Sequence, residues 1–325
     1  MDKARLLKVL EQFKSKKILV IGDIMLDKYI WGDVSRISPE APVQIVNVVK
    51  ETYEAGGAAN VANNISALSG KSIMVGIAGN DEAKNILIGE LKNKNVDVQG
   101  IFIDNDKPTT QKVRVMGRSQ QLLRFDYEKR EHVHQNIEKS ILDFLDKIMK
   151  EIDVIVISDY AKGVITEAIS KNLIESAKKH NKHVIVDPKP KHKGFYSDVF
   201  LITPNNAEAG EMAGMEDGSD EAVIEMGNNL LKSINANVLI TRGEKGMSLF
   251  EKGGKVTHIP ANAKEVYSLI GAGDTVAATA ALAIASGANL EEASILANIA
   301  AGIKVGKIGT ASVSIDEIKK EIESL

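Results

Sequence analysis

A short glycine-rich stretch, Gly271-Ala272-Gly273-Asp274, stands directly before an alanine-rich run that is typical of a helix. The first turn of such a helix leaves backbone N–H groups unpaired at the positive end of the helix dipole, and the glycines let an anion approach them closely. Asp274 adds a carboxylate that can take the proton of an attacking hydroxyl group. The stretch therefore predicts a phosphoryl-transfer site; the alternative is a glycine turn with Asp274 as a helix cap.

Two earlier stretches combine groups that suit a sugar. Asp23 and Asp27 follow the first strongly apolar run of the chain, and ligands of open α/β sheets lie beyond the carboxyl ends of such strands. Gly56 and Gly57 precede a second helix start, where the amide of Asn60 can both donate to and accept from a diol. The alternatives are a solvated loop at the two carboxylates and tight helix–strand packing at the glycines.

The composition excludes several classes of protein. The chain has 325 residues, of which 44% are hydrophobic, and its 41 basic and 44 acidic residues leave a net charge of −3, which gives no reason to expect nucleic acid or a membrane surface as partner. It has no cysteine, so disulfides, thiolate catalysis and Cys-ligated zinc are excluded. No apolar segment is long enough for a membrane span, and no signal-type segment begins the chain, so we expect a cytoplasmic protein.

Apolar runs of strand length alternate with amphipathic stretches of helical period along most of the sequence. This rhythm predicts an α/β fold with a mostly parallel central sheet flanked by helices. No internal repeat or linker interrupts it, so we expect a single domain over 1–325.

Two segments, about 28–55 and 98–128, break the rhythm with β-type patterns. In the second, Lys112, Arg114 and Arg118 alternate with valines, which places the cations on one strand face. Either the two segments together form a small β-sheet lid whose basic face meets the substrate, or the basic strand face is simply solvated.

Polar residues and glycines also follow the later strands, at the edge where an α/β enzyme keeps its site. Thr241 stands beside two glycines that either let a nucleotide lie against the backbone or form a hairpin turn. Cations after strand ends are candidate phosphate ligands. The candidate site residues at this edge are therefore Lys162, Lys189, Asn205, Glu208, Thr241, Gly243 and Gly246. Lys162 and Lys189 are the two cations among them.

Over essentially its whole length the chain resembles the PfkB/ribokinase family of carbohydrate and nucleoside kinases. The resemblance rests on Gly56-Gly57-Ala-Ala-Asn60, Asn205-x-x-Glu208 and Gly271-Ala-Gly-Asp274, in that order. Within this family the chain is most similar to the heptose 7-phosphate 1-kinases. The stretches that carry this second resemblance are Gly22–Asp27, Ser35–Pro42, Ser119–Arg124, Ser158–Gly163 and Val305–Thr310.

The resemblance implies a ribokinase-like fold and a role for each matched residue. Asp274 matches the catalytic base and Gly271, Ala272 and Gly273 the anion hole. The family's sugar-binding positions correspond to Asp27, Gly57 and Asn60. Two further candidates for sugar binding are Asp23 and Gly56. Asn205 and Glu208 match a motif that acts near Mg²⁺ and the phosphates, with Glu208 as the metal-side residue. The positions Lys189, Thr241, Gly243, Gly246 and Asn298 are assigned to ATP.

The resemblance further implies that ATP phosphorylates the C1 hydroxyl of a heptose 7-phosphate, and that the lid forms a homodimer. The cations Lys112, Arg114, Arg118 and Lys162 are the candidates for the sugar phosphate, with a lid arginine favoured. Heptose kinases occur alone or fused to a nucleotidyltransferase, and we expect that second activity to lie outside this chain.

The sequence departs from its relatives just before the anion hole. Ser268 and Ile270 stand where relatives carry Asp and Thr in a D-x-T-G-A-G-D pattern. This loop helps to hold a monovalent cation in many relatives, so a potassium requirement stays open. Two alternatives also stay open: another sugar or sugar-phosphate kinase of the family, and a sugar- or nucleotide-sensing protein on the kinase fold.

Overall fold

A large sheet forms the centre of the computed structural model, which describes residues 2–118, 120–216, 219–262, 266–307 and 311–324. Within these residues the sheet has nine strands in the order β13-β12-β11-β10-β9-β8-β1-β4-β5. The strands are β1 (Lys17–Gly22), β4 (Lys71–Gly79), β5 (Asp97–Asp104), β8 (Val154–Ser158), β9 (His183–Asp187), β10 (Leu201–Ile202), β11 (Asn237–Thr241), β12 (Met247–Phe250) and β13 (Val256–Ile259).

Seven neighbouring strands of this sheet, β5, β4, β1, β8, β9, β10 and β11, run parallel to one another. β12 and β13 close the edge beyond β11 with antiparallel pairing. Alternate residues of the central strands enter two separate cores: Ile18 and Val20 pack on one face of β1, and Leu19 and Ile21 on the other. Because both faces are buried, the central strands read as continuous apolar runs. This confirms the predicted α/β class with a mostly parallel sheet.

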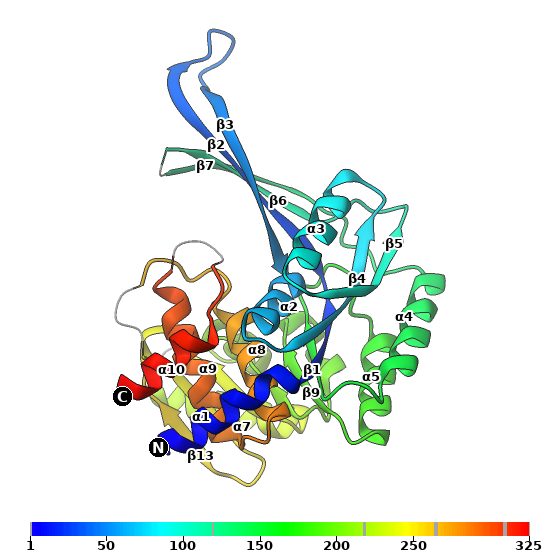
Figure 1. The fold of residues 1–325 in the computed structure, drawn as a ribbon, viewed down its shortest axis with the longest axis vertical. Helices are drawn as coiled ribbons and strands as arrows, with labels where there is room; N and C mark the ends of the chain where they lie inside the picture. The colour runs from blue at the N-terminus through cyan, green and yellow to red at the C-terminus, as the bar shows by residue number, and fades with distance from the viewer. Residues whose placement is uncertain (1, 119, 217–218, 263–265, 308–310, 325) are drawn as a thin grey trace.

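Helices cover both faces of the large sheet (Figure 1). One face packs against α1, α2, α3, α8 and α9, with α10 outside them, and the other packs against α4 to α7. The α-helices are α1 (Lys3–Gln12), α2 (Ala58–Ala67), α3 (Glu82–Asn93), α4 (Gln135–Ile148), α5 (Glu167–Lys179), α6 (Asn206–Ala213), α7 (Asp220–Ile234), α8 (Ala272–Ala285), α9 (Leu290–Val305) and α10 (Ile315–Ser324). Three short 3-10 helices complete the chain: η1 (Phe13–Ser15), η2 (Pro190–Tyr196) and η3 (Gly243–Lys245).

A second, four-stranded sheet projects from the body as the lid (Figure 1). Its strand order is β3-β2-β6-β7, in which β2 pairs parallel with β6 and antiparallel with β3. The strands are β2 (Ile24–Ile37), β3 (Gln44–Gly57), β6 (Gln111–Gly117) and β7 (Gln120–Tyr127). The predicted lid is thereby confirmed in outline.

One predicted boundary of the lid is wrong. The segment 98–128 was expected to belong to it, but residues 97–104 form β5, the edge strand of the large sheet. Most positions of β5 are partly or fully exposed, as in the lid strands, because β5 is an edge strand of the large sheet. Of the stretches used for the resemblance, Ser119 and residues 308–310 lie outside the described residues.

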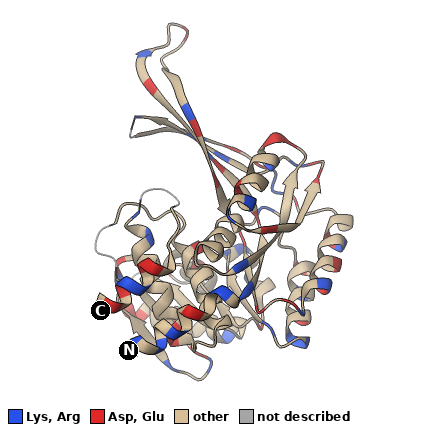
Figure 2. Ribbon diagram, viewed as in Figure 1, with Lys and Arg blue, Asp and Glu red and all other residues tan. Residues whose placement is uncertain are grey.

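Charges of both signs are interspersed over the body and the lid, in agreement with the balanced composition (Figure 2). Among the described residues, no helix is both long enough and apolar enough to cross a bilayer.

Candidate active site

The strand order brings the polar strand ends together. β1, β8, β9, β10 and β11 are consecutive neighbours in the large sheet and run in the same direction. Their carboxyl ends therefore form one edge, where the side chains that follow each strand face a common region. The residues at this edge are Asp23 after β1, Asp159 and Tyr160 after β8, Asp187 at the end of β9, Asn205 after β10 and Thr241 at the end of β11.

Asp274 lies in the first turn of α8 and is only 5% exposed. One oxygen of its carboxylate accepts a hydrogen bond from Nδ2 of Asn60 at 2.6 Å, and the other accepts one from the Tyr160 hydroxyl at 2.8 Å. Asn60 comes from α2 and Tyr160 from the loop after β8, so three separate elements fix one carboxylate. The structure thus brings two of the predicted site residues, Asn60 and Asp274, into direct contact.

Burial raises the pKa of the Asp274 carboxyl above its ordinary value, and Asp27 adds to the rise. The hydrogen bonds from Asn60 and Tyr160, together with the charge of Lys304, oppose it and lower the pKa. Tyr160 remains a proton donor because burial and the neighbouring Asp274 raise its own pKa well above the ordinary value. A carboxylate with raised basicity that two donors orient is suited to act as a general base.

The start of α8 is built without a side-chain cap. Gly271 is the N-cap with φ +75°, and no side chain of this residue can bond the first N–H groups. A Cβ atom on Gly271 would lie 2.8 Å from Nδ2 of Asn60, so both the backbone conformation and the contact with Asn60 favour glycine. The Ala272 N–H donates to the Leu269 carbonyl oxygen at 3.3 Å, so the anion that the sequence predicts at residues 271–273 would be met first by the N–H groups of the two glycines.

The residues predicted to bind the sugar lie at the base of the lid. Asp27 is 6% exposed, and its Oδ1 accepts a hydrogen bond from Arg114 of β6 at 2.5 Å. A side chain on Gly56 would collide with the carboxylate of Asp27, and Gly57 has a φ of +58° where the chain passes from β3 into α2. The two glycines thus let Asp27 and Asn60 approach the same region.

Asp23 is placed differently. It is buried, and its carboxylate accepts hydrogen bonds from the backbone N–H groups of Tyr160, Lys162 and Val164 at 2.9–3.0 Å. Burial and Asp159 raise its pKa, and these three hydrogen bonds lower it. Asp23 therefore holds the loop that carries Tyr160, and its direct contact with a sugar stays a prediction.

The predicted lid cations are already paired with acids. Arg114 pairs with Asp27, and Lys112 pairs with Asp126 at 2.9 Å. Lys162 reaches the lid from the loop after β8 and pairs with Glu128 at 2.5 Å. Arg118 stands apart from this group, because it is exposed at the turn between β6 and β7. The structure thus gathers three of the four cations at the base of the lid.

On the nucleotide side, Asn205 and Glu208 form a capping box at the start of α6. The Asn205 side chain accepts the Glu208 N–H at 2.9 Å, and Glu208 accepts the Asn205 N–H at 3.1 Å. The other carboxylate oxygen of Glu208 pairs with Lys189, whose ammonium group also lies 5.5 Å from the centre of the Tyr160 ring. Three predicted site residues are therefore in contact within reach of Tyr160, which bonds Asp274.

The remaining nucleotide-side candidates lie around β11 and α9. Thr241 ends β11 and forms an isolated bridge with Asn205. Gly243 begins η3, and Gly246 ends it in the hairpin that leads to β12. Asn298 is buried in α9 and donates to the carbonyl oxygen of Pro260 at 2.8 Å. Their contact with ATP stays a prediction.

The residues beside Glu208 fit a divalent cation. Burial raises the pKa of the Asp187 carboxyl well above its ordinary value, and the neighbouring Asp274 and Glu208 raise it further. Such a group of close carboxylates is stabilised when a cation relieves the repulsion, and carboxylate oxygens are the ligands that Mg²⁺ prefers. Asp187 and Glu208 are thus the side chains that suit Mg²⁺ here.

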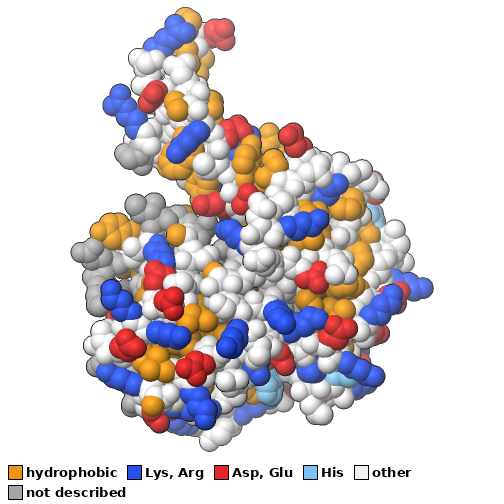
Figure 3. All heavy atoms as spheres, viewed as in Figure 1, with side chains coloured by type: hydrophobic (Ala, Val, Ile, Leu, Met, Phe, Trp, Pro, Cys, Tyr) orange, Lys and Arg blue, Asp and Glu red, His pale blue; other side chains and the backbone are white. Residues whose placement is uncertain are grey.

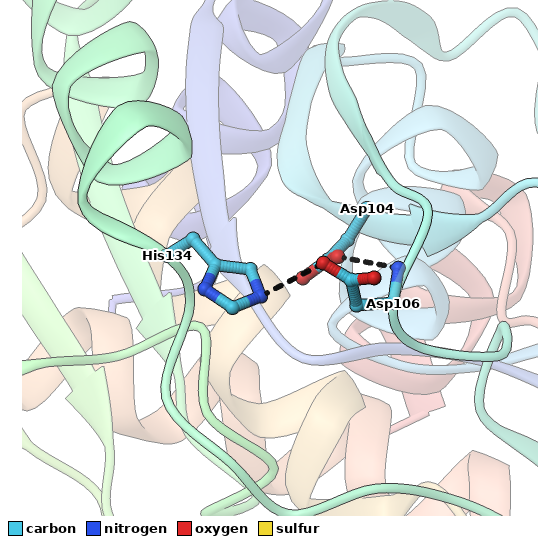
Figure 4. A group of neighbouring side chains, drawn as sticks. All are labelled: Asp104, Asp106 and His134. Carbon is cyan, nitrogen blue, oxygen red and sulfur yellow. Dashed lines mark hydrogen bonds and ion pairs between the residues drawn. The ribbon is translucent and has the colours of Figure 1, made fainter.

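Another group of possible metal ligands lies outside this edge. Asp104, Asp106 and His134 offer ligand atoms within 4.8 Å of one another, beyond the end of the edge strand β5 (Figure 4). His134 pairs with Asp106 at 3.2 Å, and Oδ1 of Asp104 accepts the Asp106 N–H. The negative charge of Asp104 acts to raise the pKa of the ammonium groups of Lys107 and Lys129. The cluster is balanced by these cations, and we assign no ion to it.

Three residues of the site were not among the sequence candidates: Tyr160, Asp187 and Lys304. Tyr160 and Asp187 follow strand ends, so the strand-end argument that selected Asn205 applies equally to them. Lys304 carries no such signal, because a lysine in the last turn of a helix is ordinarily a surface residue that complements the helix dipole.

Comparison with known proteins agrees with this arrangement. The profile of the pfkB family carbohydrate kinases matches residues 15–317. The chain is 44% identical over 301 residues to the bifunctional protein HldE of Geobacter sulfurreducens, covering 92% of this chain and 61% of that protein. With the bifunctional protein HldE of Sulfurimonas denitrificans the identity is 42% over 320 residues, covering 98% of this chain and 66% of the relative. The chain therefore spans about three fifths of the length of these relatives.

Solved structures show the same fold at lower identity. The Arabidopsis thaliana ribokinase complexed with ribose and ATP is similar with a TM-score of 0.75 at 20% identity, over 95% of this chain and 98% of the ribokinase. The Escherichia coli phosphofructokinase-2 in complex with fructose-6-phosphate gives a TM-score of 0.76, also at 20% identity, over the same shares of the two chains. The fold is ribokinase-like, and the chain belongs to the pfkB family of carbohydrate kinases.

Proposed function

We propose that this chain transfers the γ-phosphoryl group of ATP to the C1 hydroxyl of D-glycero-D-manno-heptose 7-phosphate and forms the 1,7-bisphosphate. The observation that carries the proposal is the buried Asp274, oriented by Asn60 and Tyr160 at the uncapped start of α8. The similarity to the HldE proteins over nearly the whole chain supports a heptose substrate rather than another sugar.

In the proposed reaction the acceptor hydroxyl lies against Asp274, which removes its proton as the oxygen attacks the phosphoryl group. The N–H groups at the start of α8 face the transferring group and stabilise its negative charge. Tyr160 and Asn60 keep the carboxylate in the orientation that meets the hydroxyl. Mg²⁺, when bound beside Asp187 and Glu208, neutralises charge on the nucleotide phosphates.

The phosphate of the sugar requires cations at the other end of the substrate. Arg114 lies next to Asp27 at the base of the lid, and its guanidinium group can form two parallel hydrogen bonds to a phosphate. Arg118 is four strand positions farther out, about 13 Å along the strand. We therefore place Arg114, with Lys112 and Lys162, ahead of Arg118 as the ligands of the sugar phosphate.

The lid also supports a homodimer. Large apolar side chains that are exposed in the single chain gather on its strands and on its tip (Figure 3). Exposed apolar patches of this kind commonly mark protein interfaces. The side chains are Ile37, Val43, Val48, Val49, Leu123, Phe125 and Tyr127. We propose that two lids pair through them, and light scattering after gel filtration should give twice the mass of one chain; a monomeric mass at micromolar concentration would contradict this.

A panel of sugars and sugar phosphates in a coupled ADP-release assay tests the activity. We expect the highest kcat/KM for heptose 7-phosphate, and a rate that rises with pH because Asp274 must be ionised to accept a proton. Since burial raises the pKa of Asp274, the acid limb of the profile lies above the pH at which an exposed aspartate ionises. Asp274→Asn should lower kcat at least 1,000-fold, on the order of the loss of a principal catalytic group.

The same panel separates the alternatives. A preference for a different sugar phosphate would make the chain another kinase of the family. Binding of sugar or nucleotide without turnover, and an Asp274→Asn variant identical to the wild type, would favour a sensing protein.

A further inference from the structure

Lys304 is fully buried in the last turn of α9, with 0% exposure. Lysine is almost never fully buried unless its charge is compensated, because removal of an ammonium group from water is costly. The fold therefore retains a charge at a place where an apolar side chain would be cheaper to bury. This burial is the feature of the site that the sequence did not indicate.

The position of Lys304 connects it to the anion hole. Its Cε lies 3.5 Å from the point that a Cβ on Gly271 would occupy, and Oδ2 of Asp274 lies 3.6 Å from the same point. The side chains of Lys304, Asp274 and Asn60 thus converge on the α-carbon of Gly271, the residue that begins α8.

The loop before the anion hole rests on the same end of α9. The N–H groups of Tyr267 and Ser268 both donate to the carbonyl oxygen of Val305, at 2.7 and 3.1 Å. Ser268 in turn accepts the N–H of Ile270 at 3.3 Å. The segment from 267 to 271 is therefore attached to the residue that follows Lys304.

The charges around Asp274 come from several elements. Asp27 of β2 and Asp187 of β9 interact unfavourably with its carboxylate, whereas Lys304 of α9 interacts favourably with it. Burial lowers the pKa of the Lys304 ammonium group below its ordinary value and Lys307 lowers it further, whereas Glu54 of β3 and Asp274 oppose this shift and favour the charged form. Lys307 is bound by Glu317 and the Ser312 carbonyl oxygen. Lys304 is thus a cation of α9 whose charge acts on Asp274 and whose side chain reaches Gly271.

We propose that Lys304 is a positioning residue of the phosphoryl transfer proposed above: its buried side chain lies beside Gly271 and Asp274, where its ammonium group favours the charged carboxylate and adds positive charge behind the backbone to which the transferring group would bind. The inference rests on that proposed function, because a base and an anion hole have to be used for it to matter. It assigns the charge balance of the site to a residue outside the family motifs.

Lys304→Met tests the proposal because methionine keeps most of the length and volume and removes the charge. We expect kcat to fall 100- to 1,000-fold, as when one group that stabilises the transition-state charge is lost, with KM for ATP and sugar within about threefold. Lys232→Met is the matched control, since Lys232 occupies the last turn of α7 but is exposed. This control should retain full activity.

Two readouts distinguish charge from packing. Without the cation the pKa of Asp274 rises further, so the acid limb of kcat/KM should move to higher pH in Lys304→Met. Lys304→Ala leaves a cavity that ethylammonium can fill, so added ethylammonium chloride should restore part of its rate, whereas ethanol should not. If the acid limb of kcat/KM does not move in Lys304→Met and ethylammonium does not restore the rate of Lys304→Ala, then Lys304 only fills space. That result would overturn the proposal.

Folding and substrate identity are controlled separately. Thermal unfolding reports whether each variant folds, and Lys304→Gln replaces Lys304→Met if the latter does not. Binding of ADP with aluminium fluoride, which imitates the transferring phosphoryl group, needs no knowledge of the sugar. We expect at least tenfold weaker binding of this complex by the variant and unchanged binding of ADP alone. If the wild type phosphorylates no sugar, the proposed function fails. The role of Lys304 is rejected by a separate result, equal binding of ADP with aluminium fluoride by the wild type and by Lys304→Met.

Discussion

Two helix starts in this molecule have the same sequence pattern and the same local geometry, but different surroundings. Asn205 and Glu208 begin α6, and Asn289 and Glu292 begin α9. In each pair the asparagine side chain accepts the glutamate N–H at 2.8–2.9 Å, and the glutamate accepts the asparagine N–H at 2.9–3.1 Å. Both are capping boxes, which satisfy two N–H groups that a helix leaves unpaired.

The difference lies in the second carboxylate oxygen of each glutamate. That of Glu208 pairs with Lys189, beside Tyr160 and near Asp187, at the carboxyl edge of the sheet. That of Glu292 pairs with Arg5 of α1 at 3.3 Å, in a partly exposed contact far along the chain. The comparison teaches that the N-x-x-E pattern by itself specifies a helix cap, and that a role in phosphoryl transfer requires the strand ends around it.

The largest expected contrast comes from removing the two charges. Glu208→Gln and Glu292→Gln both keep a side chain that can complete the capping box. We expect Glu208→Gln to lower kcat by about 10- to 100-fold, because a carboxylate that serves the metal side of the site is lost. Glu292→Gln should leave kcat unchanged. Steady-state kinetics at several Mg²⁺ concentrations measure both effects, and the Mg²⁺ dependence should change only in Glu208→Gln.

Thermal unfolding of the same two variants checks that the contrast is one of function. Each should unfold within about 2 °C of the wild type, since the cap is kept and the partly exposed partner contacts contribute little. Equal kinetics in the two variants would mean that Glu208 is a cap and nothing more, and the metal-side assignment would then be withdrawn.

The fold was largely predictable because it depends on local patterns. The predicted mostly parallel sheet follows from the apolar runs of its central strands, whose two faces are both buried. The capping box at the start of α9 can likewise be read from Asn289 and Glu292 alone, and the helix follows it to Val305. The error at β5 arose because the sequence of a partly exposed strand does not say which sheet the strand joins, and the pairing of β5 with β4 appears only in the folded chain.

The site was predictable where a residue type is required by its own neighbours in sequence. Gly271 needs a positive φ at the start of α8, and that requirement is visible as a glycine before a helix. The charges that favour the ammonium form of the buried Lys304 come from Glu54 and Asp274, which are distant in sequence, so no local pattern could indicate this arrangement. The pairing of Arg114 with Asp27 likewise depends on the parallel register of β2 and β6, which only the folded lid shows.

A smaller contrast comes from removing the two asparagines. Asn205→Ala and Asn289→Ala each remove one cap, which should cost about 1 kcal/mol of folding stability in both variants, measured as similar decreases in the urea midpoint. Only Asn205→Ala should also affect catalysis, by a few-fold in kcat, because the first turn of α6, which carries Glu208 and its pairing with Lys189, loses the side chain that accepts the Glu208 N–H. If the two variants lost stability equally and Asn205→Ala kept full kcat, Lys189 and the backbone N–H of residue 205 would suffice to orient Glu208, and the asparagine caps would contribute to folding at both helix starts and to the reaction at neither.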